Sequence, residues 1–283
     1  MKAFLDDTAQ IIGATFEFDQ VVRGRSDREK EIGQFVLDKA KLVYDNAKKI
    51  GGVKFLPGLE ARLMRVVYLK KYSSNEEGED KAVTGENTQN LEGISEEELE
   101  LRQELVDYGN KLVKKDLVQG TWGNLSVRLD DEYMLVTPSG IDYARLTPGD
   151  MVKVKIDDLS YDESGLKPTS EKVLHAAIYK NRADICGIIH THSTYCSVFA
   201  AAVKPLIPED EKGLEVFGNY VDIADYGTPG SKALGENTMK ALGDNFGAIM
   251  AHHGMVTCGK SLKRAFKNAV ILEESAKDYL DKR

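Results

Sequence analysis

The sequence has 283 residues, 42% of them hydrophobic, and a formal net charge of −8. A chain of this length can bury a sizeable core, and it contains no run of about 18 apolar residues that would predict a transmembrane helix. Because it has neither the apolar region of a secretion signal nor a stripe of lysine and arginine, we expect a cytoplasmic protein that binds neither membrane nor nucleic acid.

The first 72 residues predict a small α/β appendage ahead of the main domain. Apolar residues recur at helical spacing over about 4–12 and 32–43, and again over 59–69. Between these patterns, an apolar, strand-like run at 53–56 ends at a Pro-Gly pair. No motif in this N-terminal appendage carries chemistry, so the sequence predicts no role for it.

Residues 73–94 are predicted to form an acidic flexible linker. Ten acidic side chains and one basic side chain fall within residues 73–100, and most of this stretch lacks large apolar residues. Such a segment cannot bury enough surface to offset the entropy lost on ordering. The alternative is a solvated acidic helix, which Gly78 and Gly85 disfavour.

A helix from about 96 to 116 is predicted to open the second domain, residues 95–283. Ser95 and Glu98 have the spacing of a capping box, in which the serine caps the third helical amide and the glutamate reaches back. Apolar residues then recur at helical spacing as far as Leu112. The sharp start of this helix marks the end of the linker.

Strands and helices alternate after this helix. Two alternating runs flank Asp130-Asp131-Glu132 and predict a β-hairpin. In chain order we expect strands at 125–129, 133–137 and 152–156, a helix at 171–181, a strand at 186–192 and a helix at 261–280. The hairpin favours an α/β domain with a central, largely antiparallel sheet flanked by helices.

The three cysteines and one isolated histidine are interpreted as structural. Cys186, Cys196 and Cys258 are odd in number and lack CxxC spacing, which is typical of reduced thiols in a reducing compartment. They also fit the role of small buried hydrophobic residues. His175 stands alone on a predicted helix, which favours a hydrogen-bonded structural histidine.

The remaining histidines suggest a metal site. Four of the five histidines fall in two clusters, His190-Thr191-His192 and His252-His253. Residues two apart on a strand project to the same face, so the first cluster can present two imidazoles side by side to a divalent ion. A third ligand from the second cluster would complete a three-histidine site with an open position, the pattern of catalytic zinc. Packed or surface histidines are the alternative for the first cluster alone, and the second cluster favours the metal.

Three turn segments have the composition of an anion site. Residues 120–124 form a glycine-rich turn before a strand, residues 137–140 a turn after a strand, and residues 169–170 the start of a helix. Hydroxyls, an amide and free backbone N–H groups at a helix start can bind phosphate without lysine. Each segment alone is typical of a plain turn or helix cap, so the prediction depends on their combination.

The order of these motifs resembles the class II aldolase/adducin family. Over about residues 96–283 the sequence has, in the order and approximate spacing of the family, GTWGNLS at 120–126, TPSG at 137–140, PTSE at 168–171, HTHS at 190–193 and HHG at 252–254. The resemblance implies a central antiparallel sheet flanked by helices, and a homotetramer with zinc sites near subunit interfaces.

The resemblance also implies roles for individual residues. Zinc, or another divalent metal, would be bound by His190, His192 and His253, and Glu171 would act as general acid/base beside the metal. The phosphate group of a small sugar phosphate would be held by Thr121, Asn124, Ser139, Gly140, Thr169 and Ser170.

Glutamate at position 171 favours an aldolase, because the sugar-phosphate 4-epimerases of the family carry aspartate there. The implied reaction is retro-aldol cleavage of a ketose 1-phosphate into dihydroxyacetone phosphate and an aldehyde. Zinc would polarise the carbonyl and adjacent hydroxyl oxygens, and Glu171 would move a proton at the dihydroxyacetone phosphate carbon.

The sequence departs from the family pattern in two places. The aldolases of the family use a tyrosine from a neighbouring subunit as proton donor to the aldehyde, and neither Tyr220 nor Tyr226 aligns with it; Tyr226 better matches a turn before the last helices. The family pattern also includes, in some members, a C-terminal tail that closes the site and that is missing after Arg283. Residues 1–72 are a candidate replacement for that tail.

Two other kinds of function stay open. Relatives with the same ligands and a glutamate base dehydrate methylthioribulose 1-phosphate, and others epimerise sugar phosphates on the same type of metal site. An adducin-like binding module is the non-enzymatic alternative. A binding module does not need the metal ligands, so the intact set of His190, His192, His253 and Glu171 weighs against it.

Overall fold

The computed structural model describes residues 38–39, 41–54, 91, 93–118 and 122–283. The helices predicted near 4–12 and 59–69 lie outside this part of the chain, as does nearly all of the predicted linker. Of the strand-like run at 53–56, only Val53 and Lys54 are described, and neither belongs to a strand.

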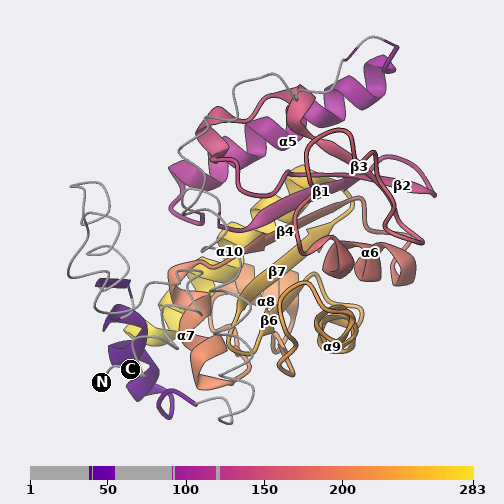
Figure 1. Cartoon of the computed structure of the whole chain (residues 1–283). Coiled ribbons are helices and arrows are strands. Elements are labelled where there is room, and N and C mark those ends of the chain that lie inside the picture. The colour runs from indigo at the N-terminus through magenta and orange to yellow at the C-terminus, as the bar shows by residue number, and fades with distance from the viewer. Residues whose placement is uncertain (1–37, 40, 55–90, 92, 119–121) are drawn as a thin grey trace, which may run out of the picture.

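A seven-stranded sheet forms the centre of the described chain, in the order β3-β2-β1-β4-β7-β6-β5 (Figure 1). The strands are β1 (Asn124–Arg128), β2 (Tyr133–Val136), β3 (Val152–Lys155), β4 (Gly187–Thr191), β5 (Ile223–Ala224), β6 (Gly247–Met250) and β7 (Gly254–Gly259). Every neighbouring pair is antiparallel except β5 and β6. The predicted largely antiparallel sheet is therefore confirmed.

Helices cover both faces of this sheet. They are α5 (Glu96–Lys114), α6 (Lys172–Asn181), α7 (Thr194–Ala202), α8 (Glu211–Phe217), α9 (Lys232–Leu242) and α10 (Leu262–Asp281), with short 3-10 turns at Tyr143–Arg145 and Pro148–Asp150. On one face, α5, α7, α8 and α10 share an apolar cluster with the sheet. On the other, α6 and α9 share a second cluster with it.

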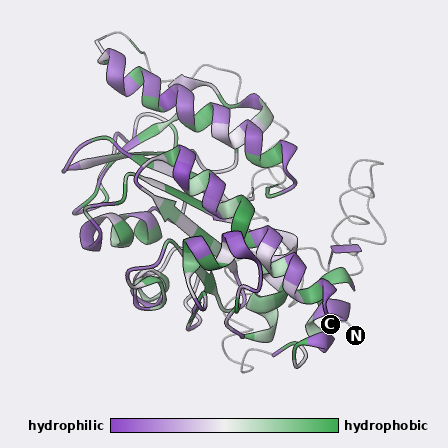
Figure 2. Ribbon diagram, turned by 180° about the vertical axis from the view of Figure 1, so that it is seen from behind, coloured by the Kyte–Doolittle hydropathy of each residue, from purple (hydrophilic) through white to green (hydrophobic). Residues whose placement is uncertain are grey.

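The side chains of the central strand β4 show how the two layers arise. Ile188 packs into the cluster with α6 and α9, whereas the next residue, Ile189, packs into the cluster with α5, α7 and α10. Successive strand residues point to opposite faces, so a strand covered on both sides must be apolar throughout. Figure 2 shows the consequence, with hydrophobic colour concentrated in the strands and mixed colour on the covering helices. Full burial of each such side chain contributes roughly 1.5–3 kcal/mol.

Helix α5 begins where the capping box predicted. The Ser95 side chain accepts a hydrogen bond from the backbone N–H of Glu98. The Glu98 carboxylate instead turns to Arg102, 2.7 Å away, and to Lys153 on β3, 3.1 Å away. Arg102 also donates to the Met151 carbonyl. This ion pair joins the first helix of the domain to the edge of the sheet.

A helical segment of the N-terminal appendage packs onto the same domain. Residues 38–39 and 41–49 are helical, and Val43, Ala47 and Ile50 are buried in the cluster that contains α7 and α10. The Lys49 ammonium donates to the Leu280 carbonyl at the end of α10. This segment and the main domain therefore share one apolar cluster.

The remaining sequence predictions agree with the structure to within two residues at each end. The predicted elements correspond to α5, β1, β2, β3, α6, β4 and α10. Helices α7, α8 and α9 and strands β5, β6 and β7 were not among the predicted elements. None of the described helices is both long and apolar enough to span a membrane.

Candidate active site

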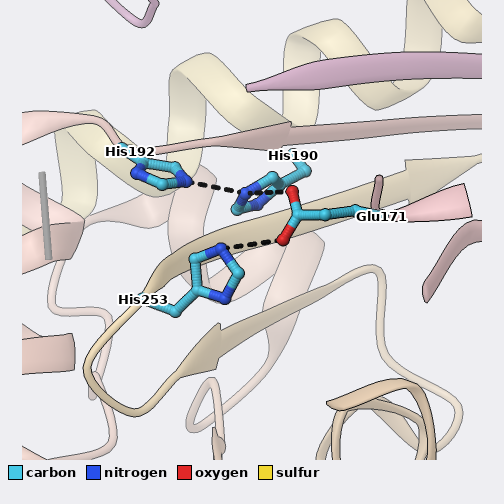
Figure 3. Close-up of side chains that lie close together, drawn as sticks. All are labelled: Glu171, His190, His192 and His253. Carbon is cyan, nitrogen blue, oxygen red and sulfur yellow. Dashed lines mark hydrogen bonds and ion pairs between the residues drawn. The ribbon is translucent and has the colours of Figure 1, made fainter. Parts of the chain in front are cut away.

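Four buried side chains from separate parts of the chain meet on the α6 side of the sheet (Figure 3). His190 lies on β4 and His192 directly after it, His253 lies in the turn between β6 and β7, and Glu171 is the N-cap residue of α6. The potential ligand atoms of these four residues lie within 4.8 Å of one another. The structure therefore brings together the predicted metal ligands and the predicted acid/base.

The strand pairing places His253 beside the other two histidines. β7 pairs antiparallel with β4, with Met255 opposite Thr191, and the tight turn from β6 to β7 lies at the same end. A Cβ on Gly254 would come within 2.4 Å of the Thr191 carbonyl oxygen. Only glycine allows so close an approach of two backbones, which explains the glycine that follows the two histidines.

The hydrogen bonding of His190 fixes which ring nitrogen faces the group. Its Nδ1 lies 2.9 Å from the Met255 carbonyl oxygen, and because a carbonyl only accepts, Nδ1 carries the hydrogen and donates. Nε2 faces Glu171 Oε2 at 3.1 Å and His192 Nε2 at 2.9 Å, so it donates to the carboxylate when the ring is protonated and offers its lone pair to a metal when the ring is neutral. A backbone carbonyl behind the imidazole is the usual arrangement for a metal-binding histidine.

The geometry fits a divalent metal such as zinc. Imidazole nitrogens bound to zinc at about 2.0–2.1 Å in tetrahedral geometry lie roughly 3.4 Å from one another. The contacts of 2.9 Å and 3.1 Å, with a largest separation of 4.8 Å, bracket that spacing. The donor set of three imidazoles and one carboxylate is one that zinc accepts. These residues could therefore hold the ion without rearrangement of the backbone.

The electrostatics of the group centre on the carboxylate. Burial raises the pKa of Glu171, but attraction and hydrogen bonds from His190 and His253 outweigh it and hold the pKa well below its usual value. Burial lowers the pKa of His190, yet the Glu171 carboxylate outweighs burial and raises it. Burial and then the charges of His190 and His253 lower the pKa of His192 strongly. A single ionised carboxylate thus faces three imidazoles in a buried site.

Comparison with known proteins places this geometry in a family. The family described as the class II aldolase and adducin N-terminal domain matches residues 103–280. The chain belongs to the class II aldolase and adducin family.

Two relatives with similar sequences are named as aldolases. The 5-methylthioribulose-1-phosphate/5-deoxyribulose-1-phosphate aldolase of Rhodospirillum rubrum is 36% identical over 63% of this chain and 80% of its own length. The L-fuculose phosphate aldolase of Escherichia coli K12 is 32% identical over 64% of this chain and 82% of its own length.

Solved structures agree with the sequence relatives. An L-fuculose 1-phosphate aldolase superposes with a TM-score of 0.60 at 38% identity, covering 64% of this chain and 84% of that one. The L-fuculose-1-phosphate aldolase of Thermus thermophilus superposes with a TM-score of 0.58 at 25% identity, covering 65% and 94%. The chain is a class II, metal-dependent aldolase, a carbon–carbon lyase.

The structure joins two of the phosphate segments predicted for this class II aldolase. Ser139 donates its backbone N–H to the Lys167 carbonyl, and Thr169 donates to the Thr137 carbonyl, so the turns at 137–140 and 167–170 lie side by side. Ser139, Gly140 and Ser170 are exposed, and Thr169 is buried. Gly140 has a φ of +81°, a conformation that favours glycine. Thr121 lies outside the described residues.

Asn124 has a different observed contact from the one predicted. Its side-chain amide is buried and donates to Glu171 Oε2 at 2.8 Å. On β1, Asn124 is paired with His190 of β4, so it lies beside one of the predicted metal ligands. A phosphate role for Asn124 remains a proposal, whereas its contact with the acid/base is part of the structure.

The two tyrosines considered as proton donors occupy different surroundings. Tyr220 is 57% exposed. The ring of Tyr226 lies 6.2 Å from that of His252, which neighbours the predicted ligand His253. Tyr226 therefore lies beside the turn that carries His253.

Glu273 is a further contributor to the site that the motifs did not indicate. From α10, its carboxylate accepts hydrogen bonds from the Ser193 hydroxyl and from the backbone N–H groups of Tyr195 and Cys196. These groups form the start of α7, directly after His192, where a negative charge stabilises the helix. The available signal was the position of Glu273, four residues after Ala269 and three before Ala276, among the apolar positions of the last predicted helix.

Proposed function

We propose that this aldolase is a zinc-dependent lyase that cleaves a ketose 1-phosphate into dihydroxyacetone phosphate and an aldehyde. The observation that carries the proposal is the buried group of Glu171, His190, His192 and His253, whose ligand atoms lie within 4.8 Å of one another. Three histidines that leave one coordination position open are the ligand pattern of catalytic zinc, and another divalent metal would fit the same donors.

The metal and Glu171 would have separate tasks. A divalent cation polarises a carbonyl oxygen and stabilises the negative charge that develops when the carbon–carbon bond breaks. In a ketose 1-phosphate, breaking the C3–C4 bond turns C4 into the aldehyde carbon as the C4 hydroxyl loses its proton, and C3 must gain one. Glu171, held ionised by its neighbours, is the group we assign to carry the proton at C3.

The phosphate end of the substrate would bind where the two exposed turns meet. Ser139, Gly140, Thr169 and Ser170 lie on these turns, directly before Glu171 and the start of α6. A helix N-terminus and neighbouring hydroxyls favour a doubly charged anion. Thr121 and Asn124 complete the proposed set. This placement puts the phosphate next to the acid/base and so fixes which carbon Glu171 faces.

The relatives suggest the class of sugar. Their names specify fuculose phosphate, 5-deoxyribulose 1-phosphate and methylthioribulose 1-phosphate, all ketose phosphates of five or six sugar carbons. We propose that the substrate of this chain is a ketose 1-phosphate of the same size.

The test is an assay of dihydroxyacetone phosphate release over a panel of ketose 1-phosphates, together with metal analysis of protein purified without chelator. We expect bound zinc, release from at least one substrate, loss of activity with a chelator and recovery with zinc. Protein without metal, or a product that keeps all the carbons of the substrate, would overturn the proposal. The latter result would indicate dehydration.

Two adjacent histidines provide a matched pair of variants for this assay. His253 belongs to the metal group, and His252 does not. The φ of His252 is +56°, a conformation that asparagine tolerates. We expect His253→Asn to lose metal and activity, and His252→Asn to keep both.

The assembly and location of the enzyme belong to the same proposal. We propose a homotetramer in the cytoplasm, with residues 95–283 as the catalytic domain, 1–72 as an appendage and 73–94 as a linker. The three free cysteines are compatible with a reducing compartment. Light scattering should give four times the mass of the chain; a monomer would refute the assembly.

A further inference from the structure

A chain of hydrogen bonds runs from the interior of the protein to Glu171. It joins five buried residues, in the order Tyr179, Ser126, His175, Asn124 and Glu171. The consecutive contacts are 2.9 Å, 2.6 Å, 2.5 Å and 2.8 Å. A network of buried polar groups makes the protein rigid when every group has a hydrogen-bond partner, and a member without a partner costs free energy.

The local folds of one strand and one helix make this chain possible. Glu171, His175 and Tyr179 are four residues apart along α6 and share one face of it, while Asn124 and Ser126 are two apart on β1 and share the face beneath. Four helical residues advance about 6.0 Å and two strand residues about 6.7 Å. The two sets of side chains can therefore interleave.

The direction of each hydrogen bond follows from the chemistry of the groups. The Glu171 carboxylate only accepts, so Asn124 Nδ2 donates to it, and Asn124 Oδ1 must be the atom that faces His175. Since Oδ1 also only accepts, His175 Nε2 carries a hydrogen and donates. Burial lowers the pKa of His175 to about 3, so the ring is neutral and its Nδ1 is an acceptor.

The same reasoning extends to the inner end of the chain. His175 Nδ1 accepts from the Ser126 hydroxyl, and Ser126 Oγ then accepts from the Tyr179 hydroxyl. Arg128 holds Tyr179 in place, because it donates to the Tyr179 carbonyl and lies over its ring. Every donor in the series therefore points towards Glu171.

We propose that His175 is a positioning residue, which holds the Asn124 amide in the one orientation that donates to Glu171. Without this contact, the Asn124 amide could turn its oxygen towards the carboxylate, which would repel Glu171 from its position beside His190 and His253. Ser126 and Tyr179 fix the tautomer of His175. The inference rests on the proposed role of Glu171 as acid/base.

The substitutions His175→Gln and His175→Asn separate positioning from packing. A glutamine places its amide near the position of Nε2 and can still donate to Asn124, whereas an asparagine places its amide near the position of Nδ1 and cannot. Loss of a residue that orients a metal-site group costs about 10–100-fold. We expect His175→Asn to lower kcat at saturating zinc by about 10-fold or more, with KM and zinc content close to wild type, and His175→Gln to keep most of kcat.

Thr238→Val is the control for loss of a buried hydrogen bond elsewhere. The Thr238 hydroxyl is buried on α9 and donates to the Leu234 carbonyl, so this variant should lower stability and leave kcat unchanged. Equal kcat values for the glutamine and asparagine variants of His175 would overturn the proposal.

A second measurement does not depend on activity. In the ¹⁵N spectrum of histidine-labelled protein, His175 should have a protonated Nε2 and a bare Nδ1 throughout the neutral pH range, and Ser126→Ala should disturb this tautomer. A protonated Nδ1 would refute the inferred direction even if the asparagine variant does not fold. If the wild-type enzyme releases no dihydroxyacetone phosphate, the proposed function fails, while the spectrum still decides the hydrogen-bond chain.

Discussion

Replacement of Glu171 by glutamine is the most direct test of the assignment of the acid/base. Glutamine has nearly the same shape and can keep its oxygen towards the Asn124 amide, 2.8 Å from Oε2. Its nitrogen would then face His253 Nε2, which lies 2.9 Å from Oε1. The side chain should therefore fit, but it cannot take up or release a proton.

The expected size of the effect follows from the task that is lost. General acid–base catalysis by a positioned side chain contributes about 10²–10⁴-fold, which corresponds to roughly 3–5 kcal/mol of transition-state stabilisation. We expect Glu171→Gln to lower kcat by that factor. The measurement is release of dihydroxyacetone phosphate at saturating zinc, with bound zinc determined on the same samples, so that loss of metal is not mistaken for loss of the base.

Glu98 offers a matched control. Both carboxylates are buried, with exposed fractions of 7% for Glu98 and 6% for Glu171, and both form ion pairs. Because Glu98 pairs with Arg102, Glu98→Gln should destabilise the protein by about 3 kcal/mol or more with kcat unchanged. If Glu171→Gln keeps more than about a tenth of kcat at full zinc occupancy, well outside the range for lost acid–base catalysis, the assignment of Glu171 is wrong.

Three further predictions concern stability and reactivity. Burial raises the pKa of Glu98, but hydrogen bonds from Arg102 and Lys153 outweigh burial and lower the pKa. The stabilisation of the folded protein by ionised Glu98 is therefore present above the unfolded pKa of about 4.3 and is lost as pH falls through the lower folded pKa. Denaturant unfolding should show a steeper acid loss of stability in the wild type than in Glu98→Gln. In the native protein a thiol reagent should modify Cys186 alone, because the other two cysteines are buried and burial raises their pKa; fast labelling of three thiols would contradict this. Val43→Asp should cost about 3 kcal/mol or more, whereas a change at the exposed Lys41 on the same helix should cost within about 0.5 kcal/mol, as thermal unfolding would show.

Elements with a strong period or a clear boundary were predictable from the sequence. The capping serine placed the start of α5, and the acidic turn placed the hairpin of β1 and β2. α7 was missed because its sequence, TYCSVFAAA, is apolar on every side and all but its first residues are buried, so it has no amphipathic period. β5 was missed because it has only two residues.

The candidate site also has parts that the sequence predicted and parts that it did not. The spacing of the histidines predicted a metal site with a third ligand from the second cluster, and the resemblance to the family singled out His253 and Glu171. The contacts that orient them were not predictable, since they require the docking of α6 on β1. The signal that existed was a pair of matching intervals, four residues from Glu171 to His175 and two from Asn124 to Ser126. Neither interval has meaning until the helix is placed on the strand.

The helical residues 38–39 and 41–49 show that the packed fold extends beyond the residues that the family match covers. The match begins at residue 103, yet Val43 and Ala47 are fully buried in the same cluster as α7 and α10. Lys39 is also buried, and its charge contributes to lowering the pKa of His192, after burial and the other charges of the site. The segment therefore covers the helix that follows His192 and brings a positive charge within electrostatic reach of a predicted ligand. That charge comes from outside the residues that the family match covers.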